Sequence, residues 1–322
     1  RRRARVSRQP DWRRRYRALI RSSRFAARQS FPEMGNTIAC GARTLDLSRP
    51  RIMGVLNVTP DSFSDGGQLY RDGRVDTDAL LTRAEQMLVE GADILDVGGE
   101  STRPGAAAVS EAEELDRVVT AVEALARHCD TIISVDTSTP NVMRESARCG
   151  AGLLNDVRGF QRPQALQAAA DTGLALCVMH MQGEPDTMQT APTYSDVVQD
   201  IAEFLSLRLA DVTGAGINLD RVIIDPGFGF GKTAEQNFEL LARLEVLCNQ
   251  GQPVLVGLSR KSMISSVLDR PPERRMVASV ALALMAVERG ARIVRVHDVA
   301  ATFDALSMWQ TTRHVLSQSQ PL

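Results

Sequence analysis

Polar residues able to do chemistry recur at one kind of position in this sequence, directly after short apolar runs. After the first four runs they are Asn57, then Asp96 with Glu100, Thr102 and Arg103, then Asp136, then Asn155 with Asp156. After the last four they are His180, then Asp225, then Ser259, Arg260 and Lys261, then Arg295 with His297. Carboxylates and an amide can hydrogen-bond a flat, donor-rich heterocycle, and cationic side chains can bind a phosphate. The residue types together suggest a ligand with a polar ring and an anionic group.

Each of these residues also has a purely structural interpretation. A single Asp after a strand most often caps the next helix. Asp136 fits that role poorly because Ser138 or Thr139 is better placed to cap. Asp225 also fits it poorly, because Pro226 and a glycine-rich loop precede the next helix. These two carboxylates are therefore the stronger candidates for chemistry.

The remaining candidates have weaker cases. Asp96 and Asp156 could have no role beyond fixing loops, which is the alternative to a role in chemistry, and His180 could be a core histidine. His128 and His314 lie in helical segments and are expected at the surface. The sequence has no His-Glu-x-x-His pattern and no His/Cys cluster, so a metal cage built by the protein alone is not expected.

A different kind of cation site remains possible. A single oxygen ligand suits Mg²⁺ when substrate phosphates and water supply most of the other ligands. Asn57 is the candidate for that ligand.

Residues 227–233 (GFGFGKT) imitate a phosphate-binding P-loop. The Walker pattern requires a glycine five positions before the glycine of Gly-Lys-Thr, and Pro226 stands there. The stretch is better interpreted as a loop that shapes a pocket, with Phe228 or Phe230 against an aromatic ligand.

The elements that must position these residues follow one repeating pattern, an apolar run, a polar loop and a helix-period segment. Apolar runs without polar alternation are typical of strands buried on both faces of a parallel sheet. There are eight such runs, at 52–58, 92–97, 131–135, 152–155, 174–179, 221–224, 253–258 and 292–296.

Eight strands alternating with helices predict a (β/α)8 barrel, here a single domain over about 51–316, with one loop segment at 182–193. In such a barrel the strand tips converge on one mouth, where active sites lie. An open doubly wound sheet is the alternative. It would need a glycine-rich dinucleotide turn after the first strand, where the sequence has Asn-Val-Thr-Pro.

Composition limits the class of protein. The chain has 322 residues, of which 43% are apolar, which is enough for a substantial core. No stretch approaches the ~18 apolar residues that a membrane span needs. The five cysteines are an odd number without a Cys-x-x-Cys pair. They argue against a disulfide framework and a zinc knuckle, so we expect a reduced, cytoplasmic protein.

The net charge of −1 conceals an uneven distribution. Residues 1–33 carry twelve Arg beside Asp11 and Glu33, whereas the rest has 26 basic and 37 acidic residues. The basic extension could be a transit peptide or a membrane or nucleic-acid arm. We expect it to be disordered, or to precede a true translational start at Met34, leaving 34–322 as the barrel. The acidic body gives no support for a nucleic-acid partner.

Long ordered motifs after Arg51 resemble bacterial dihydropteroate synthase, a pterin-binding family. Residues 54–67 (GVLNVTPDSFSDGG) and 91–105 (GADILDVGGESTRPG) are similar to its first two signatures. The resemblance continues through 136–137, 155–156, 179–183, 225–227, 259–262 and 295–297. It therefore covers essentially the whole barrel.

The resemblance implies a homodimeric (β/α)8 transferase of folate biosynthesis, the target class of sulfonamides. Such an enzyme joins 6-hydroxymethyl-7,8-dihydropterin diphosphate to 4-aminobenzoate, giving 7,8-dihydropteroate and pyrophosphate. Asp136, Asp225 and Lys261 would be catalytic, and Mg²⁺ would be the cofactor, with Asn57 as its ligand.

Each ligand has a matching set of residues by the same resemblance. The implied pterin set is Asp136, Asn155, Met179, Asp225, Gly257 and Lys261. The diphosphate set is Thr102, Arg295 and His297, and the aminobenzoate set is Phe63, Thr102, Arg103, Pro104, Phe230 and Ser262.

Two other functions were weighed against this one. A methyltetrahydrofolate methyltransferase would share the barrel but has no use for a diphosphate site, so Asn57 and the Arg295-x-His297 pair argue against it. A non-catalytic pterin-binding module would be suggested by loss of the first loop or of Lys261, and both are present. No Ser or Cys nucleophile is required for the synthase reaction.

Overall fold

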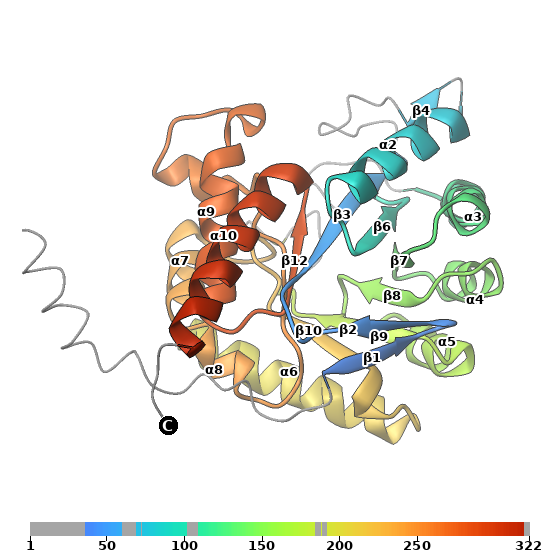
Figure 1. Ribbon diagram of the computed structural model, residues 1–322. Helices are drawn as coiled ribbons and strands as arrows, with labels where there is room; N and C mark the ends of the chain where they lie inside the picture. The colour runs from blue at the N-terminus through green and yellow to red at the C-terminus, as the bar shows by residue number, and fades with distance from the viewer. Residues whose placement is uncertain are drawn as a thin grey trace, which may run out of the picture. The chain divides into compact units, whose positions relative to one another are not determined.

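Eight parallel strands alternate with helices along the chain, as the sequence predicts. The computed structural model describes residues 36–59, 69–71, 73–101, 109–183, 188 and 192–318 (Figure 1). The parallel strands are β3 (Arg51–Asn57), β6 (Ile94–Gly98), β7 (Ile132–Asp136), β8 (Leu153–Asp156), β9 (Ala175–Met179), β10 (Val222–Asp225), β11 (Leu255–Val256) and β12 (Ile293–Val296). The helices between them lie around the outside of the strands (Figure 1).

The eight strands close into a barrel. Their order is β10-β9-β8-β7-β6-β3-β12-β11, and the two ends of this series meet. The amide of Ile224 donates to the carbonyl of Pro253 at 3.0 Å, and Ile224 pairs in parallel with Val254, next to β11. The barrel prediction is confirmed, and the open doubly wound alternative is wrong.

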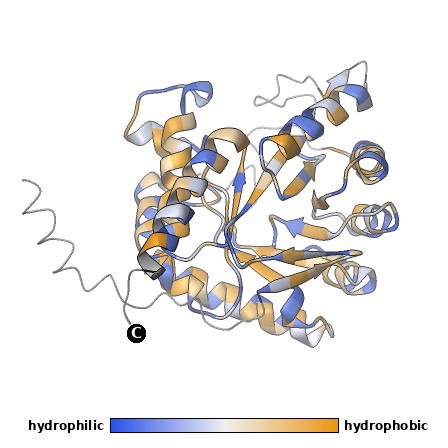
Figure 2. Cartoon of the chain, viewed as in Figure 1, coloured by the Kyte–Doolittle hydropathy of each residue, from blue (hydrophilic) through white to orange (hydrophobic). Residues whose placement is uncertain are grey.

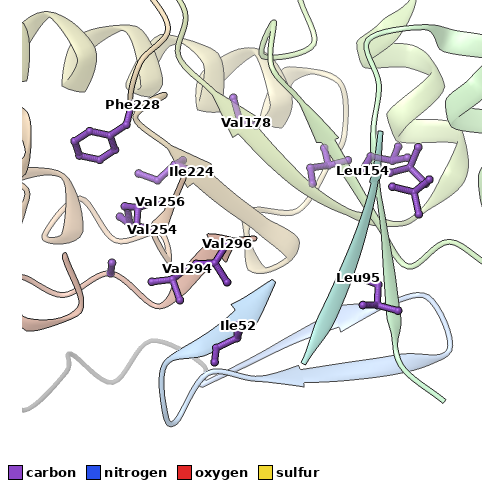
Figure 3. Close-up of a cluster of buried hydrophobic side chains, with 14 of the residues drawn as sticks. Ile52, Leu95, Leu154, Val178, Ile224, Phe228, Val254, Val256, Val294 and Val296 are labelled. Carbon is purple, nitrogen blue, oxygen red and sulfur yellow. The ribbon is translucent and has the colours of Figure 1, made fainter. Parts of the chain in front are cut away.

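Side chains alternate between the two faces of each strand. The outward set packs against the helices and includes Ile52, Leu95, Leu154 and Val294 (Figure 3). The inward set fills the lower barrel with Met53, Ile94, Ile132, Leu153, Ala175, Cys177, Ile223, Leu255 and Ile293. Both faces are apolar at this level, which is why the sequence runs lack polar alternation.

A short antiparallel hairpin, β1 (Thr37–Cys40) and β2 (Arg43–Asp46), closes the lower end of the barrel. Its buried side chains Ile38, Cys40 and Leu45 join the inward apolar cluster. The hairpin approaches closely because Gly152 has no Cβ, and one there would lie 2.8 Å from the Cys40 carbonyl oxygen. This hairpin was not expected from the sequence. A second hairpin, β4 (Tyr70–Arg71) with β5 (Arg74–Val75), follows the first loop.

The helices on the outside begin and end at recognisable signals. They are α2 (Thr77–Val89), α3 (Glu111–His128), α4 (Pro140–Arg148), α5 (Ala165–Thr172), α6 (Val197–Gly214), α7 (Ala234–Ala242), α8 (Glu245–Cys248), α9 (Met276–Glu288) and α10 (Val299–Gln318). Short 3-10 segments are η2 (Leu219–Arg221), η3 (Ser262–Ser266) and η4 (Pro272–Arg274). Ser110 and Glu113 form a reciprocal capping box on α3. None of the described helices is long and apolar enough to cross a membrane.

The predicted cap of α4 is partly wrong. Thr139 is the N-cap residue and Pro140 opens the helix, but the Thr139 side chain makes no capping hydrogen bond. Its hydroxyl donates instead to Glu114 of α3 at 2.6 Å, and Thr137 donates to the other oxygen of the same carboxylate. Glu114, a buried residue of the neighbouring helix α3, therefore fixes the start of α4 by accepting hydrogen bonds from the two threonine hydroxyls.

Candidate active site

Above the apolar layer, the inward positions of the strands become polar. Asp136 pairs in register with Asn155 on the next strand, and Asp225 pairs with Met179 in the same way. The polar inward residues are Asp96, Asp136, Asn155, Asp225 and Arg295, with Lys261 following β11. The convergence of strand tips predicted from the sequence is thus realised as one polar layer above the apolar barrel interior.

Arg295 on β12 links two of these carboxylates. Its Nε donates to Asp96 at 2.6 Å, and a terminal nitrogen donates to Asp136 at 3.0 Å. Burial alone would lower the pKa of Arg295, but the charges of Asp96 and Asp136 outweigh it and raise that pKa above its ordinary value. Arg295 therefore stays a permanent cation at the centre of the barrel mouth.

Asp136 does not cap a helix, because Thr139 is the N-cap residue of α4 and the Asp136 carboxylate instead accepts from Arg295. Burial raises its pKa to about 7, against the opposing effect of Arg295, and the neighbouring charge of Asp96 raises it further. A carboxylate with a pKa in this range can change its charge when a ligand or proton arrives.

Asp96 belongs to the same layer, although on sequence grounds it was a weaker candidate than Asp136 and Asp225. Its side chain is fully buried, and its second oxygen accepts from Arg295 and, at 3.5 Å, from Asn155. Within the described residues, the other oxygen of Asp96 and the side-chain oxygen of Asn155 are buried with no hydrogen-bond partner. Two such acceptors in the same layer suit a ligand that brings N–H donors.

Asp225 lies at the end of β10, where the chain turns sharply. Its carboxylate accepts from the Gly227 amide at 2.7 Å. Gly227 has a φ of +68°, and a Cβ there would lie 1.9 Å from the carbonyl oxygen of His180, so only glycine fits. Burial raises the pKa of Asp225 to about 6, although the Gly227 amide opposes the rise.

Lys261 faces this carboxylate from the loop after β11. Burial lowers its pKa to about 8, and the nearby charge of Arg295 lowers it further. Its ammonium lies 4.1 Å from the centre of the Phe230 ring, which also contacts a buried cluster containing Met179. Phe228 instead packs in the outer core beside Ile224 (Figure 3), so Phe230 is the aromatic residue of this loop that faces the site.

The part of the mouth next to β11 is formed by the ends of β12 and β3. The ring of His297 contacts the Ser259 hydroxyl at 3.0 Å through Nδ1, and its backbone carbonyl accepts from Arg83 of α2. Gly257 keeps the space beside Arg295 open, since a Cβ there would still lie 4.0 Å from the Cβ of Arg295.

Asn57 ends β3 and lies in register with Gly98. Its side chain makes no hydrogen bond to any other described side chain, so its oxygen is available to a cation. No group of three His, Cys, Asp or Glu residues among those described could hold a metal ion on its own. A single neutral oxygen at this position suits a cation that takes most of its other ligands from phosphate and water.

The other predicted residues divide into three groups. Ser262 opens η3 next to Lys261. Phe63, Thr102, Arg103 and Pro104 lie outside the described residues. His180 is a buried core histidine whose pKa is lowered by burial and by the Lys232 ammonium.

Asp156 fixes loops, the alternative left open by the sequence: it binds its own loop and the loop that follows β7. Its carboxylate accepts from the Ser138 hydroxyl and from the amides of Arg158 and Phe160. His128 and His314 are exposed on their helices, as predicted.

Comparison with known proteins places this arrangement in a family. A family model described as pterin binding enzyme matches residues 53–297. Dihydropteroate synthase from Haemophilus influenzae is 54% identical over 270 residues, which cover 84% of this chain and 96% of the relative. The Escherichia coli dihydropteroate synthase is 50% identical over 269 residues, 84% of this chain and 94% of the relative.

Solved structures agree. Yersinia pestis dihydropteroate synthase with a sulfonamide drug complex superposes with a TM-score of 0.83 at 51% identity, covering 86% of this chain and 99% of that one. Xanthomonas albilineans dihydropteroate synthase in complex with 7,8-dihydropteroate gives a TM-score of 0.77 at 45% identity, covering 88% and 100%.

Proposed function

Because the chain belongs to the pterin-binding enzymes and, within them, to the dihydropteroate synthases, we propose that it joins 6-hydroxymethyl-7,8-dihydropterin diphosphate to 4-aminobenzoate. The products are 7,8-dihydropteroate and pyrophosphate, and the reaction is a transferase step of folate biosynthesis. The observation that carries this proposal is the inward polar layer of buried Asp96, Asn155 and Asp225 with the partly exposed Asp136, closed on one side by Lys261.

The pterin ring binds in this layer. Its amino and ring N–H groups are donors, and the free oxygens of Asp96 and Asn155 together with Asp136 and Asp225 are acceptors. A buried acceptor without a partner costs free energy, so a ligand that satisfies it gains affinity and orientation together. Lys261 donates to the acceptor edge of the ring, and Phe230 covers its face.

The diphosphate lies toward Arg295 and His297, where the mouth is cationic. Mg²⁺ would be held by the side-chain oxygen of Asn57 and by the substrate phosphates, and when bound it supplies further charge neutralisation to the leaving group. Arg295 also neutralises the charge of the leaving group, and it is permanently charged because Asp96 and Asp136 raise its pKa.

The reaction breaks the bond between the pterin methylene carbon and the diphosphate oxygen, and the electron pair leaves with pyrophosphate. The amine of 4-aminobenzoate supplies the pair for the new C–N bond, and its displaced proton passes to solvent. Positive charge on the pterin during this exchange is stabilised by ionised Asp136 or Asp225. We expect a dissociative reaction, in which the bond to the diphosphate breaks before the C–N bond forms. A rate that changes little with the nucleophilicity of the amine supports this order, and a steep dependence contradicts it.

The aminobenzoate site is formed by Phe230 and Ser262 together with Phe63, Thr102, Arg103 and Pro104 of the first two loops. Phe230 and Ser262 lie at the outer side of the pterin layer, next to Lys261. In this proposal the incoming amine lies between the pterin and the barrel mouth.

A direct assay tests the activity. The chain is supplied with pterin diphosphate, Mg²⁺ and 4-aminobenzoate, and pyrophosphate release is measured. We expect release that requires the aminobenzoate and is stoichiometric with dihydropteroate. Pyrophosphate formed equally without the aminobenzoate would contradict the synthase and indicate a hydrolase.

A homodimer is the assembly we propose. Helix α9 has the sequence MVASVALALMAVE, with Glu288 as its single charged residue, and such a helix is normally buried on all sides. Hydrophobic residues dominate α9 (Figure 2). Yet Val277 is 69% exposed and Met285 44% exposed on it, and Met308 on the adjacent α10 is 67% exposed. A second copy of the chain would cover this apolar surface.

The cellular location we propose is the cytoplasm. All five cysteines are free, and three of them are buried in the core. This state is compatible with a reducing compartment.

A further inference from the structure

The second lysine of the chain, Lys232, has no part in the proposed chemistry, yet it is 2% exposed. It closes the loop of residues 227–232 that follows Asp225. Its ammonium donates to the carbonyl of Gly227 at 2.8 Å and to that of Phe230 at 3.0 Å. Its third contact, also at 3.0 Å, is Nδ1 of His180 at the end of β9. The three donors of one ammonium are thus matched by three neutral acceptors.

The conformation of the loop explains why these carbonyls converge. Gly227, Gly229 and Gly231 have φ values of +68°, +80° and +58°, and they alternate with two phenylalanines. A Cβ on Gly231 would lie 2.4 Å from the carbonyl oxygen of Gln182. A phosphate-binding loop directs its amides and its lysine outward to the ligand, whereas this loop turns its lysine inward onto its own backbone.

Other side chains complete the attachment of the loop to its surroundings. The Tyr194 hydroxyl donates to the carbonyl of Gly231 at 2.7 Å. The buried amide of Asn237 on α7 accepts from the Gly229 amide at 2.7 Å and donates to the carbonyl of Thr233 at the same distance. His180 is held by Phe204 of α6, with the ring centres 4.8 Å apart in an edge-to-face arrangement.

We propose that Lys232 is a positioning residue of the pterin site, which acts through Asp225 and Phe230 and does not touch the diphosphate. Lys232 joins the tip of β9 to the start and the later part of the loop of residues 227–232. This loop follows Asp225 and contains Phe230. The inference rests on the proposed function, because it concerns how well this chain binds a pterin.

A neutral side chain could not replace the ammonium. Three acceptors point at one place, and an apolar group there would leave all three buried without a partner. Charged groups of the site act on Lys232 from two sides, with Asp225 stabilising the cation and Lys261 opposing it. Burial lowers the pKa of Lys232 to about 7, which is consistent with an ammonium enclosed by neutral groups.

The test compares two ligands that differ only in the diphosphate. Calorimetry with Mg²⁺ present gives the Kd of 6-hydroxymethyl-7,8-dihydropterin and of its diphosphate for the wild-type chain and for Lys232→Met. We expect both affinities to fall by roughly tenfold or more, and by the same factor. Loss for the diphosphate alone would overturn the proposal, because Lys232 would then be a phosphate ligand. Unchanged affinity for both would overturn it as well.

Two further variants separate positioning from general loss of stability. Leu240→Ala weakens the core of α7 without touching the loop hydrogen bonds, so it should lower Tm but leave both Kd values unchanged. Tyr194→Phe removes a single loop hydrogen bond and should weaken both ligands by a smaller common factor, even where Lys232→Met fails to fold. Equal weakening by Leu240→Ala would show that Lys232 acts only through stability.

A spectroscopic signature adds an independent readout. The ¹⁵N resonance of His180 Nδ1 should move when Lys232 is replaced by Met and stay in place in Leu240→Ala. No movement in the Lys232 variant contradicts the contact on which the proposal depends. Failure of the wild-type chain to bind either pterin would instead contradict the proposed function.

Discussion

The charge of Arg295 is shared between two carboxylates of unequal accessibility. Asp96 has no exposed side-chain surface, whereas the Asp136 side chain is 16% exposed and lies nearer the mouth. Asp96 therefore fixes the guanidinium, and Asp136 is the carboxylate that a ligand can reach. This division was not predictable from the sequence, because a lone Asp after an apolar run has the same appearance in both roles.

Replacing Asp96 by Asn tests this division. The change removes a charge that raises the pKa of Asp136 and leaves Arg295 paired with Asp136 alone. We expect the unfolding free energy to fall by about 1–3 kcal/mol and the pKa of Asp136 to fall. The acid limb of the pH profile of kcat/KM should then move to lower pH. Asp298→Asn, which breaks the Arg260 ion pair outside the pterin layer, is the control. An acid limb that stays in place contradicts the coupling.

Pterin affinity should depend on pH in both directions. Asp225 and Asp136 must be ionised to accept hydrogen bonds, and their pKa values are raised to about 6 and about 7. Affinity should therefore rise with pH through this range. It should fall again above about 8, where Lys261 loses its proton. Calorimetric measurement of the pterin Kd from below about pH 6 to above about pH 8 follows both the rise and the fall. An affinity that does not change with pH contradicts the roles given to Asp136, Asp225 and Lys261.

The same raised pKa values affect the free protein in the opposite sense. A carboxyl whose pKa is higher in the folded than in the unfolded state binds its proton more tightly when folded. Its contribution to stability therefore declines as pH rises from near 4 to near 7. Without ligand, the chain should unfold more readily at the pH at which it binds pterin well.

At the scale of elements, the alternation of strands and helices was predictable because both faces of each strand are buried. The length of β11 was overestimated, since the apolar run of 253–258 forms a strand only at Leu255–Val256. Pro253 has no amide hydrogen to donate and lies outside the strand. The hairpin β1–β2 was missed because four-residue strands carry little periodic signal, although Ile38 and Cys40 do alternate with exposed neighbours.

The packing of the β1–β2 hairpin can be tested by adding a single methyl group at Gly152. In Gly152→Ala the new Cβ meets the backbone of Cys40, which cannot move without moving the hairpin. We expect a loss of about 1–3 kcal/mol in unfolding free energy, measured by urea denaturation. Gly214→Ala is the matched control, because its Cβ has no neighbour within 4 Å and its φ is ordinary for a helix. Equal stability of the two variants contradicts a tightly packed hairpin.

At the scale of the whole molecule, the uneven charge distribution acquires a meaning that the net charge did not have. The body is acidic overall, yet Arg295, His297 and Lys261 gather at the mouth. A local cationic end on an acidic barrel favours an anionic substrate there over other places on the surface. The sequence predicted which residue types lie at the mouth, but not their pairing, which depends on side-chain direction.

The assembly can be tested on α9. We expect Val277→Asp to convert a dimer to a monomer in light scattering, since the charge would be buried unpaired in the interface. Leu207→Asp on α6, where Leu207 is 62% exposed, is the matched control and should leave the mass unchanged. A wild-type chain that is already monomeric contradicts the proposed homodimer.

The β1–β2 hairpin also determines from which end of the barrel a ligand can enter. Because Ile38, Cys40 and Leu45 close the lower end, the polar layer is reached, in the described part of the chain, from the strand tips. Asn155 in that layer is 3% exposed, whereas Ser262 at the rim is exposed. A ligand that lies against Asn155 would have to bind before a ligand at Ser262 and leave after it. A ligand at the rim, whether substrate or inhibitor, would therefore slow the release of a ligand bound deeper in the polar layer.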